Sequence, residues 1–169
     1  MTPIPFVVLA LCGLAFGAVR PLPRLDGRIV GGEQTTIDKY PYQLSVRSGG
    51  YHFCGASIIG PNHALTAAHC VRNGSPNGIS LHAGTSYKTQ VGSKHNAVKV
   101  TVHPRYGSSD YDFAILEVGT PFPIGQEGIQ SIELCSVEPS AGETSVISGW
   151  GAVSVSIIPY LVHMCQFLK

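Results

Sequence analysis

The run CGASIIGPNHALTAAHC (54–70) carries the strongest fold signal in this chain of 169 residues. It is built on two apolar, β-prone segments, 53–59 and 64–67, separated by the turn-forming residues Gly, Pro and Asn. His69 follows two alanines and directly precedes Cys70. A histidine that acts as a general base needs its ring held in one tautomer, and small neighbours beside an anchored cysteine would fix its backbone. A lone histidine is more commonly a surface or packed residue, so the role of His69 depends on what accompanies it.

A second informative run, DYDFAILEV (110–118), places an acidic residue before an apolar segment. A carboxylate at Asp112 is costly to bury unless a donor such as a histidine N–H hydrogen-bonds it, and the alternative is an exposed aspartate at a strand end. His69 followed by Asp112 matches two thirds of a His–Asp–Ser triad. Such a triad also needs a serine downstream of the aspartate, in a glycine-rich turn. Residues 113–169 contain no Gly-Asp-Ser-Gly-Gly, so the sequence predicts a His–Asp pair without its nucleophile.

The composition is that of a globular chain rather than a disordered one, with 44% apolar and 12% charged residues. The formal net charge is +1, and the basic residues are scattered along the sequence. Binding to nucleic acid or to an anionic membrane would call for clustered Lys and Arg, so neither partner is predicted.

Short β-prone runs separated by Gly, Pro, Asn and Ser predict an all-β fold without a convincing amphipathic helix. In the run 97–102 three valines alternate with Ala, Lys and Thr, the period of two expected of a half-buried antiparallel strand. The run SGG (48–50) is interpreted as a hairpin turn. Strands at this spacing favour a closed barrel or a sandwich. The predicted strands are 43–46, 53–59, 64–67, 79–83, 97–103, 113–118 and 146–148.

The first 28 residues have the character of targeting and processing segments. Residues 1–17 combine an apolar stretch, FVVLALCGL (6–14), with a small-x-small site, AFG (15–17), which predicts a secretory signal and an extracellular protein. A buried helix or a membrane anchor is the alternative, but the stretch is far shorter than the ~20 apolar residues that a spanning helix needs. Residues 18–28 are rich in Pro and Arg and predict an activation pro-segment or linker.

An extracellular destination predicts paired cysteines. Cys54 and Cys70 lie 16 residues apart on either side of a compact apolar segment, a separation suited to a bridge, and two buried free thiols are the alternative. Cys135 and Cys165 could pair with each other, although nothing local supports that pairing.

No metal and no cofactor is predicted. The histidines lack the Cys-x₂-Cys or His-x₃-His spacing of a zinc site. Residues 71–109 contain no Asp or Glu, the side chains that calcium prefers.

Three ordered signals, RIVGG (28–32), the run 54–70 and DFAIL (112–116), together resemble the trypsins among the chymotrypsin-like serine proteases, and most of all the digestive trypsins of insects. The resemblance implies an all-β, trypsin-like double Greek-key β-barrel fold, with the first barrel complete and the second barrel mostly missing. It assigns 29–151 to the N-terminal part of the protease domain and leaves 152–169 as a divergent tail.

The resemblance also implies a role for each site residue. His69 would be the general base and acid, Asp112 would orient its ring, and Cys54 and Cys70 would form the disulfide beneath it.

The implied function is that of a serine-type endopeptidase that is secreted as a zymogen and cuts protein or peptide substrates after Lys or Arg. An activating protease would cleave between Arg28 and Ile29, and the freed ammonium group of Ile29 would order the substrate pocket. The chain as given is expected to be inactive, because the half that carries the catalytic serine is absent from the sequence. The alternatives are a non-catalytic homologue that acts as a binding or regulatory protein, and a small secreted structural domain with chance motifs.

Overall fold

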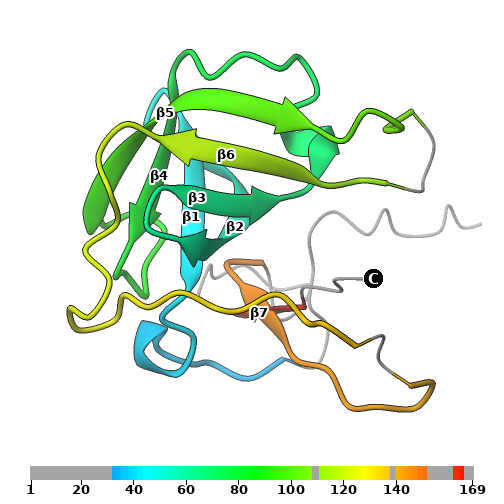
Figure 1. Ribbon diagram of the computed structural model, residues 1–169. Helices are drawn as coiled ribbons and strands as arrows, with labels where there is room; N and C mark the ends of the chain where they lie inside the picture. Colours follow the sequence, from blue (N-terminus) through cyan, green and yellow to red (C-terminus); the bar gives the residue numbers. More distant parts are fainter. Residues whose placement is uncertain (1–31, 108–110, 138–139, 152–161, 166–169) are drawn as a thin grey trace, which may run out of the picture.

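The computed structural model describes residues 32–107, 111–137, 140–151 and 162–165. Apart from two short 3₁₀ helices, η1 (Ile37–Lys39) and η2 (Ala68–Cys70), the regular structure in these ranges consists of strands. Six strands close into an antiparallel barrel in the order β1-β2-β3-β6-β5-β4 (Figure 1). They are β1 (Gln43–Ser48), β2 (Tyr51–Gly60), β3 (His63–Thr66), β4 (Ile79–Ala83), β5 (Ser93–Val102) and β6 (Ala114–Val118).

The closed barrel confirms the all-β fold and the complete first barrel predicted from the sequence. Beyond it, β7 (Ile147–Gly149) pairs with β8 (Val162–Cys165) in a separate two-stranded antiparallel sheet. The strand β8 was not predicted, and within the described ranges these two strands do not close a second barrel. No helix among the described residues is long and apolar enough to cross a bilayer.

The turn between β1 and β2 is set by two glycines. Ser48 pairs with Tyr51, so Gly49 and Gly50 alone form the loop. Both have positive φ, 57° and 86°. A two-residue hairpin loop with both central φ values positive follows the twist of the flanking strands, and glycine adopts it without steric strain. The interpretation of 48–50 as a hairpin turn is confirmed.

Alternate residues along the strands point inward and build one core. Leu44 and Val46 of β1, Leu81 of β4 and Leu116 of β6 have no exposed surface. In β1 and β4 these residues alternate with polar neighbours, the period of two that a strand requires, so the sequence pattern there positions the core directly. The core cluster comprises Leu44, Val46, Ala56, Ile58, Ala64, Ala68, Val71, Ile79, Leu81, Ala83, Ala114, Leu116, Val118, Phe122 and Ile129.

Strand β5 departs from the predicted alternation. The sequence placed three valines on one face, but Val98 is 54% exposed, whereas Val100 and Val102 pack against the core. The pairing of β5 with β6 shifts register between Ala97 and Lys99, so a bulge at Val98 rotates this side chain outward. The expectation for Val98 was wrong because a bulge inserts one residue into the period of two and is invisible to a pattern count.

Residues 119–137 leave the barrel and run beneath it toward β7, as Figure 1 shows in yellow. The chain around β7 is held to the barrel by two side-chain hydrogen bonds. The Ser148 hydroxyl donates to Gln43 Oε1 on β1 at 2.7 Å, and Trp150 Nε1 donates to the carbonyl of Ser86 at 3.0 Å. The chain around β7 is therefore anchored on β1 and on the loop after β4.

A polar network is buried on the outer face of β1 and β2. Arg47 Nε donates to the Ser45 hydroxyl oxygen at 3.0 Å, and this oxygen lies 2.9 Å from His52 Nδ1. The guanidinium of Arg47 also donates to the carbonyl of Gln90. The His52 ring packs edge-on against Trp150, with 5.3 Å between the ring centroids. Burial, together with the positive charges of Lys88 and Arg47, lowers the pKa of His52 to about 4.

This lowered pKa predicts a loss of stability on acidification. Below its ordinary pKa of 6.5, His52 takes up a proton in the unfolded chain but not in the folded one, so the free energy of unfolding falls as the pH drops from 6.5 toward 4. The loss over that window should be about 1–2 kcal/mol. Each tenfold difference in proton affinity between the folded and unfolded chain corresponds to about 1.4 kcal/mol, and solvent around this partly exposed ring reduces the full figure. Urea titrations at several pH values would measure it. His52→Gln should remove this part of the loss and make the profile shallower, and His63→Gln, at an exposed histidine, should leave the profile unchanged. Equal profiles for all three proteins would contradict the prediction.

Candidate active site

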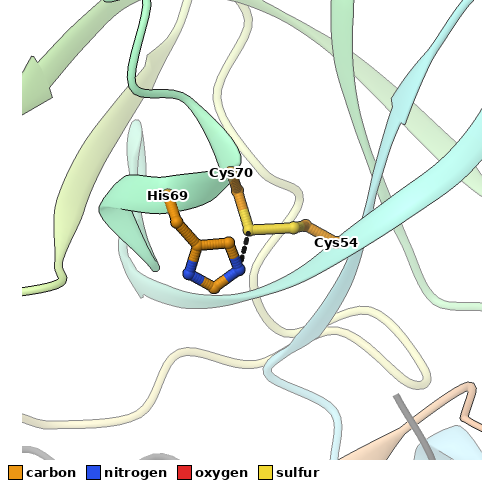
Figure 2. Close-up of side chains that lie close together, drawn as sticks. All are labelled: Cys54, His69 and Cys70. Carbon is orange, nitrogen blue, oxygen red and sulfur yellow. Dashed lines mark hydrogen bonds between the residues drawn. A yellow bond between two sulfur atoms is a disulfide. The ribbon is translucent and has the colours of Figure 1, made fainter. Parts of the chain in front are cut away.

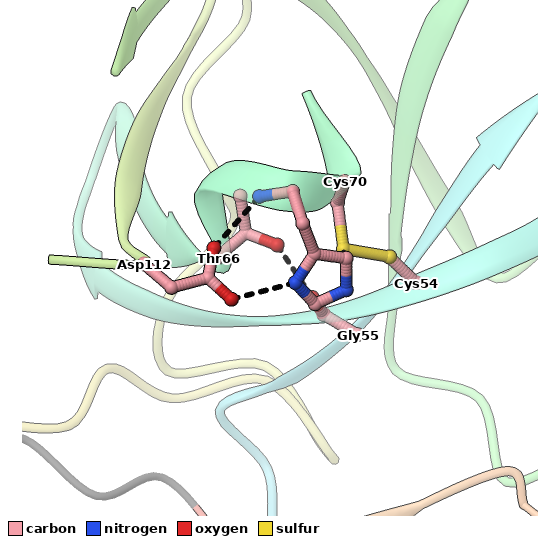
Figure 3. Close-up of polar contacts among 6 residues, drawn as sticks. Cys54, Gly55, Thr66, Cys70 and Asp112 are labelled. Carbon is pink, nitrogen blue, oxygen red and sulfur yellow. Dashed lines mark hydrogen bonds and ion pairs between the residues drawn. A yellow bond between two sulfur atoms is a disulfide. The ribbon is translucent and has the colours of Figure 1, made fainter. Parts of the chain in front are cut away.

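The backbone around His69 is fixed by the strands on either side. Strand β3 ends at Thr66, whose hydroxyl donates to the carbonyl of Gly55 on β2 at 2.8 Å (Figure 3). The chain then turns through η2, where the fully buried Ala68 faces the core and the exposed His69 faces outward. The N–H of Cys70 closes this turn by donating to the carbonyl of residue 67 at 3.2 Å. Small residues are needed here because the turn packs directly on the barrel.

A disulfide joins Cys54 on β2 to Cys70 at the end of η2, with 6.3 Å between the Cα atoms. The imidazole of His69 lies beside this bridge, and its Nε2 atom is 3.4 Å from Cys70 Sγ (Figure 2). A disulfide sulfur carries no proton, so the contact leaves the Nε2 lone pair of His69 free to accept one.

Asp112 receives two hydrogen bonds from His69. The backbone N–H of His69 donates to Oδ1 at 2.7 Å, and ring atom Nδ1 donates to Oδ2 at 2.7 Å (Figure 3). An ionised carboxylate can only accept, so Nδ1 carries the ring proton and Nε2 is the acceptor. Two contacts to one carboxylate fix both the position and the tautomer of the imidazole, as a general base requires.

The charge state of Asp112 suits this role. Burial raises the pKa of the Asp112 carboxyl. The hydrogen bonds from the ring and the backbone N–H of His69, the charge of His69 and the backbone N–H of Ala68 all lower it. These lowering effects outweigh burial, so the pKa of Asp112 lies below its ordinary value. Asp112 is therefore ionised at neutral pH. The His69 side chain is 61% exposed and that of Asp112 is 34% exposed, so the pair opens onto the molecular surface.

Three potential metal ligands meet at this site. The ligand atoms of Cys54, His69 and Cys70 lie within 4.8 Å of one another. The two sulfurs are bonded to each other, however, and neither is the thiolate that zinc requires.

Other residues singled out in the sequence are placed only in part. Arg28 and Ile29 lie outside the described residues, as does Asp110, the neighbouring acid. Cys135 is exposed, and its thiol donates to the carbonyl of Val137 at 2.8 Å. The side chain of Cys165 lies outside the described part of the chain.

Sequence reasoning missed part of the site. It anticipated the ring contact between His69 and Asp112 but not the second bond from the His69 backbone N–H, since backbone donors leave no pattern in a sequence. It also missed the hydroxyl of Thr66, although a threonine at the end of a strand was a visible signal.

A closed β-barrel that presents a His–Asp pair at its surface, with Nδ1–H directed at the carboxylate, has the arrangement of a serine protease of the chymotrypsin class. The sequence model of the trypsin family matches residues 29–162. Since this match covers well over half of the sequence, the chain belongs to the trypsin family.

Individual relatives agree with this assignment. Hypodermin-B of Hypoderma lineatum is 38% identical over 157 residues, which cover 89% of this chain and 60% of the relative. Trypsin delta of Drosophila melanogaster is 35% identical over 153 residues, covering 88% and 60%. The crystal structure of a scabies mite inactivated protease paralogue has a TM-score of 0.72 at 32% identity and covers 79% of this chain and 60% of that one. The resemblance to insect trypsins is thus confirmed, and the chain spans about 60% of the length of these relatives.

Proposed function

We propose that this chain is part of a secreted, trypsin-like serine endopeptidase and contributes its general base. The observation that carries the proposal is the double hydrogen bond between His69 and Asp112, with both distances at 2.7 Å. The substrate would be a protein or peptide, as in serine proteases of this family.

In the proposed reaction His69 Nε2 removes the proton from a serine hydroxyl while that oxygen attacks the scissile carbonyl. The carboxylate of Asp112 stabilises the imidazolium that forms and does not itself take up the proton. His69 then returns the proton to the leaving amine. Residues 113–169 contain no Gly-Asp-Ser-Gly-Gly turn. In this proposal the serine and the oxyanion donors belong to a region that corresponds to the part of the relatives that this chain does not span.

Synthesis as a zymogen and cleavage after Lys or Arg are finer parts of the same proposal. The run RIVGG (28–32) follows a short Pro- and Arg-rich segment, which supports cleavage between Arg28 and Ile29 by an activating protease. A basic residue at this bond is itself a trypsin-type cleavage site, and it supports the preference for Lys or Arg.

A non-catalytic homologue, acting in binding or regulation, is the second candidate. It is favoured by one observation, the 32% identity to an inactivated protease paralogue of the scabies mite. The retained pair of His69 and Asp112 and the exposed Nε2 atom favour the protease. Sequencing transcripts that contain this chain separates the two: an in-frame Gly-Asp-Ser-Gly-Gly downstream supports the protease, and transcripts without one would support the non-catalytic homologue.

The 169 residues alone are expected not to react with a fluorophosphonate probe, even after cleavage at Arg28. Such probes phosphonylate only an activated serine, and residues 113–169 contain no Gly-Asp-Ser-Gly-Gly turn that would present one to His69. Gel fluorescence or intact-mass measurement on purified protein would show the result, with a complete trypsin as the positive control. Stoichiometric labelling that His69→Ala abolishes would contradict the prediction and reveal a nucleophile elsewhere in the chain.

A further inference from the structure

The backbone that carries Asp112 has an unusual conformation. Tyr111, directly before it, has a φ of 63°, and it is the one non-glycine residue with positive φ in the described part of the chain. This region is unfavourable for a bulky side chain. The N–H of Phe113 donates to the carbonyl of Tyr111 at 2.8 Å, which places Asp112 at the centre of a three-residue turn. A strained residue and a tight turn therefore aim the carboxylate, and strain of this kind persists only where the surroundings hold it.

The surroundings consist of two side chains, His103 and Arg105, that contact the residues flanking Asp112. The ring of His103 stacks on Tyr111, with 4.8 Å between centroids and an interplanar angle of 8°. The same ring contacts Phe113 at 4.5 Å. The guanidinium carbon of Arg105 lies 4.1 Å from the centroid of the Tyr111 ring, within cation–π range. We call the set of His103, Arg105, Tyr111 and Phe113 the aromatic clamp.

The clamp is anchored to the barrel at the end of β5. The N–H of His103 donates to the carbonyl of Phe113 at 3.1 Å, extending the pairing of β5 and β6 by one step. The carbonyl of His103 accepts from the N–H of Tyr106 at 2.9 Å, and Tyr106 packs against the core. The backbone of His103 is thus held by two hydrogen bonds, and its ring contacts both neighbours of Asp112.

These contacts are poorly explained by a contribution to the core. Arg105 is exposed, Phe113 is 40% exposed, and no member of the clamp belongs to the buried cluster. The contacts instead fix the backbone conformation on both sides of Asp112, whose carboxylate binds His69.

We propose that Tyr111, held by His103 and Arg105, is a positioning residue for the general base. Its stacked ring keeps the backbone in the left-handed conformation that directs the Asp112 carboxylate at the backbone N–H and Nδ1 of His69. This inference deepens the proposed function and rests on it, since it assigns the support of the same His–Asp pair.

The test is the rate at which the Nδ1 proton of His69 exchanges with water, measured by NMR on the full ¹⁵N-labelled chain. Tyr111→Asn removes the ring but keeps a side chain that tolerates positive φ, so it separates stacking from backbone preference. Exchange should become at least about tenfold faster in Tyr111→Asn, because the open state of the His–Asp pair becomes more populated. Tyr111→Phe retains the stacked ring and should exchange at the original rate. Tyr87→Asn makes the same substitution at an exposed tyrosine and should have no effect.

The exchange rates distinguish failure of the clamp proposal from failure of the His–Asp pair. If the proton is protected in the original chain and equally protected in Tyr111→Asn, the clamp proposal fails while the pair stands. If the original chain shows no Nδ1 proton on His69, or shows one that Asp112→Asn leaves unchanged, the pair itself is refuted and both proposals fail. Should Tyr111→Asn lose its dispersed amide spectrum, His103→Ala removes the stacking partner from a retained tyrosine, and unchanged exchange in that variant overturns the clamp.

Discussion

Removal of the bridge between Cys54 and Cys70 is expected to lower the free energy of unfolding by about 3 kcal/mol. The two cysteines close a loop of 16 residues, and a disulfide of that span restricts the unfolded chain by about this amount. We expect the loss of local order to be larger in η2, which carries His69, than in the barrel strands, because the bridge connects η2 to β2.

The measurement is urea unfolding of the Cys54→Ala/Cys70→Ala double variant, followed through the fluorescence of Trp150, the single tryptophan of the chain. Cys135→Ala is the matched control, since this cysteine is exposed and unbridged, and its midpoint should not move. Equal midpoints for the double variant and the original chain would show that the bridge contributes nothing to stability.

Truncation of Leu116 to alanine should be among the most destabilising single substitutions in the barrel. Leu116 has no exposed surface and pairs with Ala64 on β3 and Val100 on β5, so its removal leaves a cavity between three strands. Leucine-to-alanine changes at such positions lower the free energy of unfolding by about 3–5 kcal/mol, through lost burial and the cavity that remains.

Leu134→Ala provides the matched control for this prediction, because the same atoms are removed from a side chain that is 55% exposed. Its effect should stay within about 0.5 kcal/mol. Thermal or urea unfolding of both variants would measure the difference. Similar losses in the two proteins would mean that β6 does not lie at the centre of the core.

The strands could be predicted largely from the sequence because the barrel buries alternate residues. The run 79–83 and the predicted starts of β1 and β3 agree with the structure to within one residue. The start of β5 at Ser93 could not be anticipated, since polar residues such as Lys94 and Asn96 fill its first half. Strand β8 was missed because a run of four residues is too short to establish a period of two, and because its pairing partner is the three-residue strand β7.

The site was predictable where side chains do the chemistry and unpredictable where the backbone does. His69 and Asp112 carry recognisable chemistry at a recognisable spacing, and the structure brings them together. The positive φ of Tyr111 and the second bond to Asp112 depend on how the chain turns between β5 and β6, and no single residue type announces that turn. Positive φ at a tyrosine contradicts its local preference, so local pattern rules point away from it.

The most direct test of the account is the tautomer of His69, read from ¹⁵N shifts in mildly alkaline buffer, where an ordinary histidine is neutral. If the ionised carboxylate of Asp112 holds the ring, the original chain carries the proton on Nδ1 and leaves Nε2 as the acceptor. In Asp112→Asn the amide can donate to Nδ1, and the proton should move to Nε2. A His69 that carries its proton on Nε2 in both proteins would contradict the account, because such a ring could not act as the base of a serine protease.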